Sequence, residues 1–209
     1  MRSPCYMKQM SGNLFNSEGQ RKYLTADERA AFLRAAESSD RETRTLCTVL
    51  AYTGCRLSEA LALTADRVDI AEAAITFETL KKRRKGVYRS VPVPPEVIDA
   101  LDLVHGIRKA QRARSGGRGV HLWTWSRTTA WRKVKAIMHT AGLTEGPRAM
   151  PKGLRHGFGV QGVTAKVPLN LVQRWMGHAQ LSTTAIYADA TGEEERHIAQ
   201  RMWGKNADG

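Results

Sequence analysis

The sequence predicts a mainly α-helical domain with a small antiparallel β-sheet, an α+β fold. Apolar residues recur at helical spacing on either side of residues 68–93, whereas β-branched and aromatic residues alternate within that stretch. No long internal repeat is present. At 209 residues, the chain has the length of one full domain or of one domain with a short appendage, and it is too short for two well-packed lobes.

Capping residues mark the first predicted helices. Thr25 is followed three positions later by Glu28, and this capping box predicts a helix that begins at residue 26. Asp40 begins a second predicted helix, which ends at Gly54 because glycine readily adopts the left-handed conformation at a helix end. A short helix over residues 57–64 follows.

The middle of the chain changes from helical to strand periodicity. Residues 73–80 and 87–94 alternate in the manner of strands, and the basic segment KKRRKG between them predicts a β-hairpin with a basic tip. A helix opened by proline is expected over 94–110, then a glycine-rich loop over 112–119. The remaining predicted helices are a basic one capped by Ser126 and four short ones after Pro151, Pro168, Leu181 and Gly192.

This pattern divides the chain into three parts. Residues 1–22 are polar and without period, so we expect a flexible arm, and residues 23–191 form the folded domain. Residues 192–209 form a C-terminal helix and tail, whose apolar stripe either closes its own domain or docks onto a neighbour. Tryptophans 123, 125 and 131 are expected in the core.

The charge of the chain favours a polyanionic partner. There are 33 Lys and Arg residues against 20 Asp and Glu, which gives a net charge of +13. A nucleic acid is the first candidate partner and an anionic membrane surface the second. No apolar run is long enough to span a bilayer and the N-terminal segment lacks the core of a signal peptide, so we expect a cytoplasmic protein without membrane association. The three cysteines lack paired C-x-x-C spacing, and we predict no disulfide framework and no metal site.

Three separate segments place polar groups beside helical patterns. Arg56 follows a helix-ending glycine; Lys152 and Arg155 share one face at the start of a helix, where cations and free backbone N–H groups form an anion site. His178 follows another glycine, and Tyr187 comes nine residues later. Each feature has a plain alternative as a surface or core residue, and their joint occurrence in this order is what points to a function.

In this order the segments resemble the catalytic domain of tyrosine recombinases, the phage integrase family. The family's T-G-x-R-x-x-E setting reads here as residues 53–59, and its H-x-L-R-H motif reads K-G-L-R-H over 152–156. A G-H pair and a segment like L-S-T-T-x-I-Y, here 181–187, complete the match. The resemblance runs from about Tyr23 to Trp203 and implies the fold of that catalytic domain.

Position by position, the resemblance implies an active site. Arg56 and Arg155 clamp the scissile phosphate, Tyr187 is the nucleophile, His178 hydrogen-bonds a phosphate oxygen, and Glu59 supports the active-site arginine. Lys152 stands where most of the family has histidine, so we expect a phosphate donor there that is a poor proton acceptor at neutral pH. The resemblance further implies a hairpin lysine that protonates the leaving 5′ oxygen.

Several basic residues are assigned to DNA. Lys81 is the preferred hairpin lysine, with Lys82 and Lys85 as rivals. Predicted contacts to DNA phosphates, which give affinity rather than sequence choice, are Lys82, Arg83, Arg84, Lys85, Arg132 and Lys133.

The activity that the resemblance implies is site-specific recombination. Duplex DNA is cut and rejoined through a 3′-phosphotyrosine intermediate, without metal or other cofactor. A tetramer of the protein acts on two DNA segments. The resemblance also implies a protein of a prokaryote, phage or mobile element that is associated with the nucleoid. Family members place a DNA-clamping domain before the catalytic one, and 22 residues precede Tyr23 here, so we expect weak binding alone or help from an accessory DNA-binding protein. The alternatives are a DNA-binding regulator of recombinase descent with weak or no cleavage, a strand-relaxing enzyme of the type IB topoisomerase kind, and a general RNA-binding protein.

Overall fold

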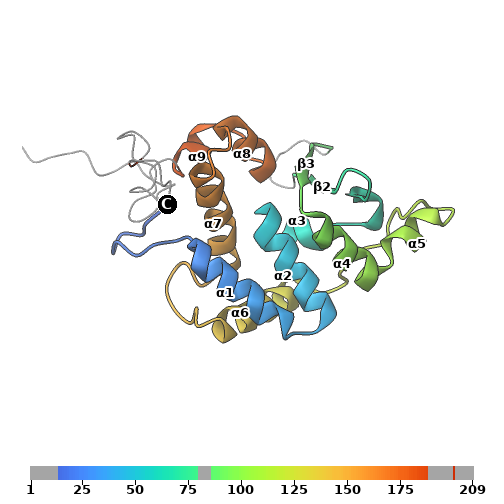
Figure 1. Cartoon of the computed structure of the whole chain (residues 1–209), viewed down its shortest axis with the longest axis horizontal. Helices are drawn as coiled ribbons and strands as arrows, with labels where there is room; N and C mark the ends of the chain where they lie inside the picture. The colour runs from blue at the N-terminus through green and yellow to red at the C-terminus, as the bar shows by residue number, and fades with distance from the viewer. Residues whose placement is uncertain (1–13, 80–85, 188–199, 201–209) are drawn as a thin grey trace, which may run out of the picture.

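A computed structural model describes residues 14–79, 86–187 and 200 (Figure 1). The strands β1 (Val68–Asp69), β2 (Ala74–Glu78) and β3 (Tyr88–Pro92) form a three-stranded antiparallel sheet in the order β1-β2-β3. A 3-10 helix, Ala65–Arg67, precedes β1, and the α-helices are α1 (Ala26–Glu37), α2 (Arg41–Thr53), α3 (Leu57–Leu61), α4 (Pro95–His105), α5 (Ile107–Arg112), α6 (Arg127–Thr140), α7 (Pro151–Thr164), α8 (Leu169–Met176) and α9 (Ser182–Ala185). The predicted α+β fold is confirmed.

The helix ends follow the capping signals of the sequence. Thr25 accepts a hydrogen bond from the backbone N–H of Glu28 at 3.2 Å, and the Glu28 carboxylate accepts one from the Thr25 N–H at 2.9 Å. The helix expected over 94–110 is instead two helices, because Gly106 takes a left-handed φ of 62° and divides α4 from α5. The helix expected after Gly192 lies outside the described residues.

Helix α2 is the centre of the main core. It packs against α1, α3, α4, α6 and α7, and it buries Leu46, Val49 and Leu50. In Figure 1 the sheet and α4–α5 lie on one side of α2, and α7–α9 lie on the other. The two sides also meet directly, because α8 contacts β3. The end of α2 is therefore surrounded by elements from distant parts of the chain.

Residues 14–22, which the sequence assigns to a flexible arm, pack against the domain where the structure describes them. Leu14 is buried, its carbonyl accepts a hydrogen bond from the Lys22 N–H at 2.8 Å, and Phe15 pairs with Arg21 in an antiparallel bridge. Leu14 and Tyr23 belong to a second apolar cluster with α7, α8 and Tyr187. The apolar residues of this short segment, spaced too irregularly for a periodicity signal, thus cover one side of α7. The rest of the predicted arm lies outside the described residues.

Helix α7 is rich in glycine where other chain segments cross it. A Cβ at Gly157 would lie 2.7 Å from the backbone oxygen of Leu24, and one at Gly159 would lie 2.6 Å from the ring of Tyr187. Real Cβ atoms do not approach other atoms this closely, so each glycine is needed for a close approach. The bare face of α7 therefore sets the position of Tyr187.

Replacing Gly157 by alanine is expected to lower the free energy of unfolding by about 1–3 kcal/mol through overpacking against backbone that cannot move aside. Helix propensity alone predicts a gain of about 1 kcal/mol for the same change. Denaturant unfolding measures the difference, with Gly162→Ala as the matched control, because the neighbour there is a side-chain methyl of Val172 at 3.0 Å. An alanine variant at 157 more stable than the parent protein would contradict this packing.

Candidate active site

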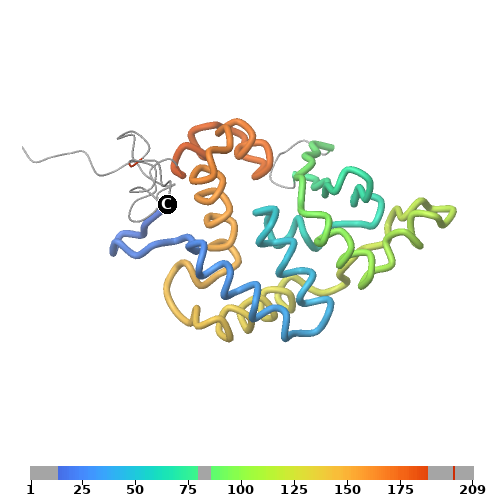
Figure 2. Tube along the Cα trace, in the orientation of Figure 1, coloured from blue at the N-terminus to red at the C-terminus, as the bar shows by residue number. Residues whose placement is uncertain are grey.

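An open cleft of about 810 Å³ lies where α3, α6, α7 and the segment around α9 meet. The predicted residues reach it from three stretches of chain, coloured cyan, orange and red-orange in Figure 2. Arg56, Lys152, Arg155, His178 and Tyr187 all line this cleft. The structure thus brings together five of the predicted catalytic residues in one cleft, whereas Glu59, Arg132 and Lys133 do not line it.

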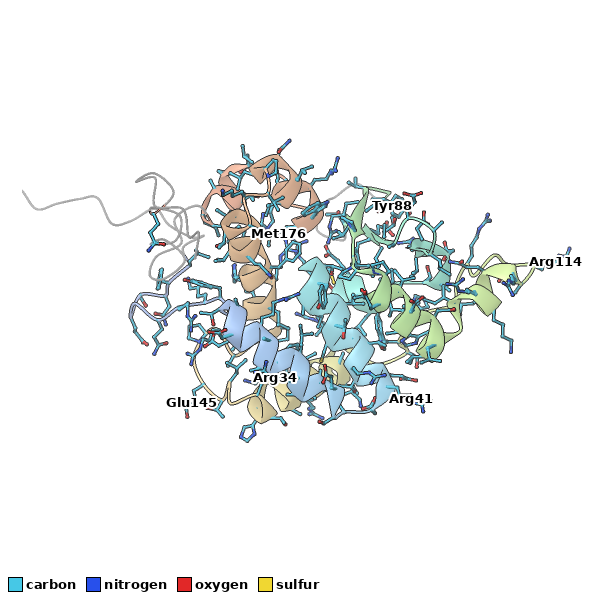
Figure 3. All side chains as sticks on the ribbon, in the orientation of Figure 1. Arg34, Arg41, Tyr88, Arg114, Glu145 and Met176 are labelled. Carbon is cyan, nitrogen blue, oxygen red and sulfur yellow. The ribbon has the colours of Figure 1, made fainter. Side chains whose placement is uncertain are left out.

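Arg155 is held by the ends of two helices. Its Nη1 donates a hydrogen bond of 2.7 Å to the carbonyl of Gly54, and its Nη2 donates one of 2.6 Å to the carbonyl of Met176. These carbonyls lie at the C-terminal ends of α2 and α8, where helix dipoles favour a cation (Met176 is labelled in Figure 3). Burial and the charge of Arg56 lower the pKa of Arg155 to about 10, which leaves it protonated at neutral pH.

A fully buried carboxylate fixes Arg56. Arg56 precedes α3 as its N-cap residue, and its Nη1 donates to Oε1 of Glu59 at 2.7 Å while its backbone N–H donates to Oε2 at 2.9 Å. The Arg56 side chain keeps 24% of its surface exposed, against 0% for Glu59. The carboxylate therefore holds one edge of the guanidinium, and the side chain still lines the cleft.

Arg89 completes this network, and the sequence analysis did not predict it. Its Nη2 donates to Oε2 of Glu59 at 2.6 Å, its Nε donates to the carbonyl of Trp175 at 2.7 Å, and its Nη1 donates to Oγ1 of Thr79 at 3.2 Å. One buried guanidinium thus joins β3, the end of β2, α3 and α8. The sequence did carry a signal for this residue. Arg89 lies two positions before the buried Val91 in β3, so the alternation of the strand places both side chains on the inner face of the sheet.

Tyr187 lies at the inner wall of the cleft with only 1% of its surface exposed. Its hydroxyl is 3.1 Å from Nδ1 of His156, and its ring is nearly parallel to that of His178, with 15° between planes and 6.2 Å between centroids. Burial raises the pKa of the phenol to about 12, although the charges of Arg155 and Arg56 act in the opposite direction. The hydroxyl is therefore protonated at neutral pH and has a polar neighbour.

The two histidines of the site are neutral at pH 7. Burial and the charges of Arg155 and Arg56 lower the pKa of His178 to about 3, and Nδ1 of His178 is 2.9 Å from Oγ1 of Thr184. Burial and the charges of Lys152, Arg155 and Lys22 lower the pKa of His156 to about 4. The sequence analysis named neither His156 nor Lys22 as a site residue, although His156 ends the K-G-L-R-H motif and Lys22 also lines the cleft.

Comparison with known proteins identifies the family. Residues 22–194 match the model of the phage integrase family. The chain belongs to this family. Tyrosine recombinase XerD of Mycobacterium leprae is 32% identical over 196 residues, which cover 85% of this chain and 59% of that protein. The chain spans about 56–60% of the length of the curated XerD relatives that it matches.

Solved structures agree on the fold. The crystal structure of XerA recombinase superposes on this structure with a TM-score of 0.70 at 26% sequence identity. The match covers 86% of this chain and 64% of the XerA chain. XerH site-specific recombinase, bound to its difH substrate, gives a TM-score of 0.67 at 21% identity over 90% of this chain and 59% of its own. The predicted resemblance to tyrosine recombinases is confirmed.

The described part of this phage integrase domain does not include every residue that the sequence analysis predicted for the site. Residues 81–85 lie outside the described part of the chain, so the choice of Lys81, Lys82 or Lys85 as the hairpin lysine stays a prediction, as do the DNA contacts of Arg83 and Arg84. Arg132 is exposed on α6. Trp131, expected in the core, is 41% exposed and lines the cleft, because it lies on the outer face of α6.

Lys133 already has partners within the protein. Its Nζ donates to Oδ2 of Asp40 at 3.0 Å and to Oγ1 of Thr43 at 3.1 Å, and it lies 4.6 Å from the ring centroid of Trp125. Asp40 is the N-cap of α2, so Lys133 joins α6 to the start of α2. This packing role was not predicted, and a DNA contact by Lys133 stays a prediction. Over residues 14–79 and 86–187, no group of His, Cys, Asp and Glu side chains is arranged to hold a metal ion.

Arg89→Ala is expected to lower the free energy of unfolding by about 3–5 kcal/mol, because it leaves the buried Glu59 carboxylate without one of its two cations. Denaturant unfolding measures this loss. The control is Arg34→Ala, an exposed arginine on α1 labelled in Figure 3, which should stay within about 0.5 kcal/mol of the parent. An equal and small effect of both changes would show that Arg89 does not hold the network.

Glu59 also predicts a pH dependence. Burial raises the pKa of Glu59, but the charge of Arg89 and the hydrogen bonds from Arg56 and Arg89 outweigh it, and the net pKa lies below the ordinary 4.5. The carboxylate therefore stabilises the fold fully above pH 4.5 and loses this contribution as the pH falls through its folded-state pKa. Glu59→Gln should be less stable at pH 7 and lose less stability on acidification, whereas Glu145→Gln, an exposed control, should follow the parent curve. Parallel curves for all three proteins would contradict the assignment.

Proposed function

We propose that this chain cuts and rejoins duplex DNA at specific sites through a 3′-phosphotyrosine intermediate. The observation that carries the proposal is the convergence of Arg56, Arg155, His178 and Tyr187 on one cleft. The names of the relatives support the same reaction, since they are tyrosine recombinases.

The two arginines suit a phosphodiester. Attack on phosphorus is slow because the nucleophile meets negative oxygens, and guanidinium groups that remain charged can neutralise them in a fixed geometry. Arg155 lies in a nearly dry setting and Arg56 is held by Glu59, so neither must reorganise as charge develops. In this proposal His178 hydrogen-bonds a phosphate oxygen, and its neutral state and its pairing with Thr184 support that role.

Tyr187 is the nucleophile of the proposal. Its oxygen attacks phosphorus, the bond to the 5′ oxygen breaks, and a lysine ammonium of the site gives that oxygen a proton. A second strand's 5′ hydroxyl reverses the step, since the phosphotyrosine keeps the energy of the original bond. Lys152, in the first turn of α7, serves as a cationic donor to phosphate.

Double-stranded DNA is the proposed partner, in a tetramer of this chain on two DNA segments, with an accessory DNA-binding protein as a further partner. The net charge of +13 supports a nucleic-acid partner through electrostatics. In the described part of the chain, no helix has both the length and the apolar character needed to cross a membrane. We further propose that the protein acts at the nucleoid in the cytoplasm.

Covalent trapping tests the function. The probe is a pool of duplexes with a randomised central segment and a nick in one strand, so that cleavage beside the nick releases a short oligonucleotide and leaves protein on DNA. The protein is expected to form an adduct stable to denaturing gels, with the phosphate on Tyr187 by mass spectrometry. Tyr187→Phe should form none, and Arg155→Ala should form it about 100-fold more slowly.

The matched control is Tyr52→Phe, because Tyr52 lies on α2 against Arg29 and outside the cleft. It should form the adduct at the parent rate. DNA binding in native gels without any adduct would contradict the proposal and favour a regulator that does not cleave. An adduct that survives Tyr187→Phe would contradict the assignment of the nucleophile.

A further inference from the structure

His156 makes the one hydrogen bond that reaches the Tyr187 hydroxyl within the described part of the chain. Its Nδ1 lies 3.1 Å from Oη, and the two rings are tilted at 55° with 5.9 Å between centroids. His156 lies one helical turn after Lys152 on α7, and only 9% of its surface is exposed. The imidazole therefore touches the reacting oxygen in a setting that excludes most water.

The other ring nitrogen of His156 is not held by the protein residues around it. Nε2 is buried and finds no hydrogen-bond partner among the residues that the structure describes. Leaving such a group unpaired costs about 1–3 kcal/mol, and buried histidines kept for packing alone normally satisfy both nitrogens. The hydrogen bond that the ring does make is the one between Nδ1 and the Tyr187 hydroxyl.

The charges around His156 keep the imidazole in the form that can accept a proton. Lys152 and Arg155 face it from α7 and Lys22 from the segment before α1, while His178 lies beyond the Tyr187 ring. With burial, the three cations lower the pKa of His156 to about 4, so the ring is neutral before DNA arrives. A bound phosphate brings negative charge to the same place, offsets these cations and makes the ring more basic when the proton must move.

Three other polar groups of the site are less suited to take the phenol proton. Nδ1 of His178 is paired with Thr184, and both oxygens of Glu59 are held by arginines. Lys152 occupies the position of the family's imidazole with an ammonium group, which donates hydrogen bonds and accepts none. None of these three is placed as His156 is placed, with a ring nitrogen on the phenol.

We propose that His156 is the proton acceptor for Tyr187. This inference rests on the function proposed above. As the Tyr187 oxygen forms its bond to phosphorus, its proton passes to Nδ1 of His156, and the imidazolium carries the charge. The bond from phosphorus to the 5′ oxygen breaks, and that oxygen takes its proton from a lysine ammonium. On rejoining, Nδ1 returns the proton to Tyr187.

The first experiment measures the rate of adduct formation with duplexes recovered from the trapped pool. His156→Gln keeps an oxygen that can accept a hydrogen bond from the phenol but cannot take its proton, and it is expected to slow the step about 100-fold. His139→Gln, at an exposed histidine near the end of α6, is the matched control and should react at the parent rate. A His156→Gln rate within about threefold of the parent would overturn the inference, since general base catalysis contributes more than that.

Two chemical changes, one in the nucleophile and one in the DNA, distinguish proton transfer by His156 from structural support of the Tyr187 ring. A fluorinated tyrosine at position 187 has a more acidic phenol. It should raise the rate of adduct formation by the His156→Gln variant by about tenfold or more. A duplex with sulfur in place of the bridging 5′ oxygen has a leaving group that needs no proton, and the His156→Gln defect should persist with it. Rescue by sulfur alone would assign His156 to the leaving group, and failure of the fluorinated tyrosine would assign it a structural role; both results overturn the inference.

The tautomer of His156 can be tested on the unaltered protein. This test decides the question even where the His156→Gln variant does not fold. Acceptance of the phenol proton requires hydrogen on Nε2 and a lone pair on Nδ1. Nitrogen NMR of labelled histidine at neutral pH is expected to show this tautomer, and hydrogen on Nδ1 would overturn the inference. An unaltered protein that forms no adduct overturns the proposed function together with this step, whereas a normal adduct from His156→Gln overturns this step alone.

Discussion

The buried carboxylate of Glu59, shared between Arg56 and Arg89, is the constraint on which the rest of the site depends. A charge with no exposed surface is tolerated only if it is fully paired, and two arginines from different elements supply that pairing. Arg89 also binds the carbonyl of Trp175, so the same network fixes the end of α8. One acidic residue thus determines where α3, the sheet and α8 meet.

This meeting point places Arg155 and Tyr187 as well. The guanidinium of Arg155 is bound by the carbonyls of Gly54 and Met176 at the ends of α2 and α8, and the Glu59 network fixes the second of these helix ends. On α7 itself, the absence of a side chain at Gly159 lets the ring of Tyr187 approach the helix closely. Cations held in place by the fold and a phenol in contact with a neutral imidazole form a cleft of positive charge, which suits the phosphate substrate that we propose.

The sequence predicted the fold and the order of the motifs because helix caps, alternation and motif spacing are local signals. It missed Arg89 because a buried arginine in a strand is explained only by Glu59, thirty residues away along the chain. His156 and Lys22 escaped for a similar reason, since the contact between His156 and Tyr187 depends on how α7 packs against the segment after α9. Lys133 looked like a surface cation, and only the packing of α6 on α2 showed that it holds Asp40.

The most direct test of the account is a crystal structure of the protein with vanadate and the two halves of a duplex recovered by trapping. Vanadate adopts the five-coordinate geometry of a phosphoryl transition state. The account predicts vanadium bonded to the Tyr187 oxygen, its equatorial oxygens held by Arg56 and Arg155, and the His156 ring still beside Tyr187. Vanadate bound away from these arginines, or a Tyr187 hydroxyl that stays in its buried position with the arginines empty, would contradict it.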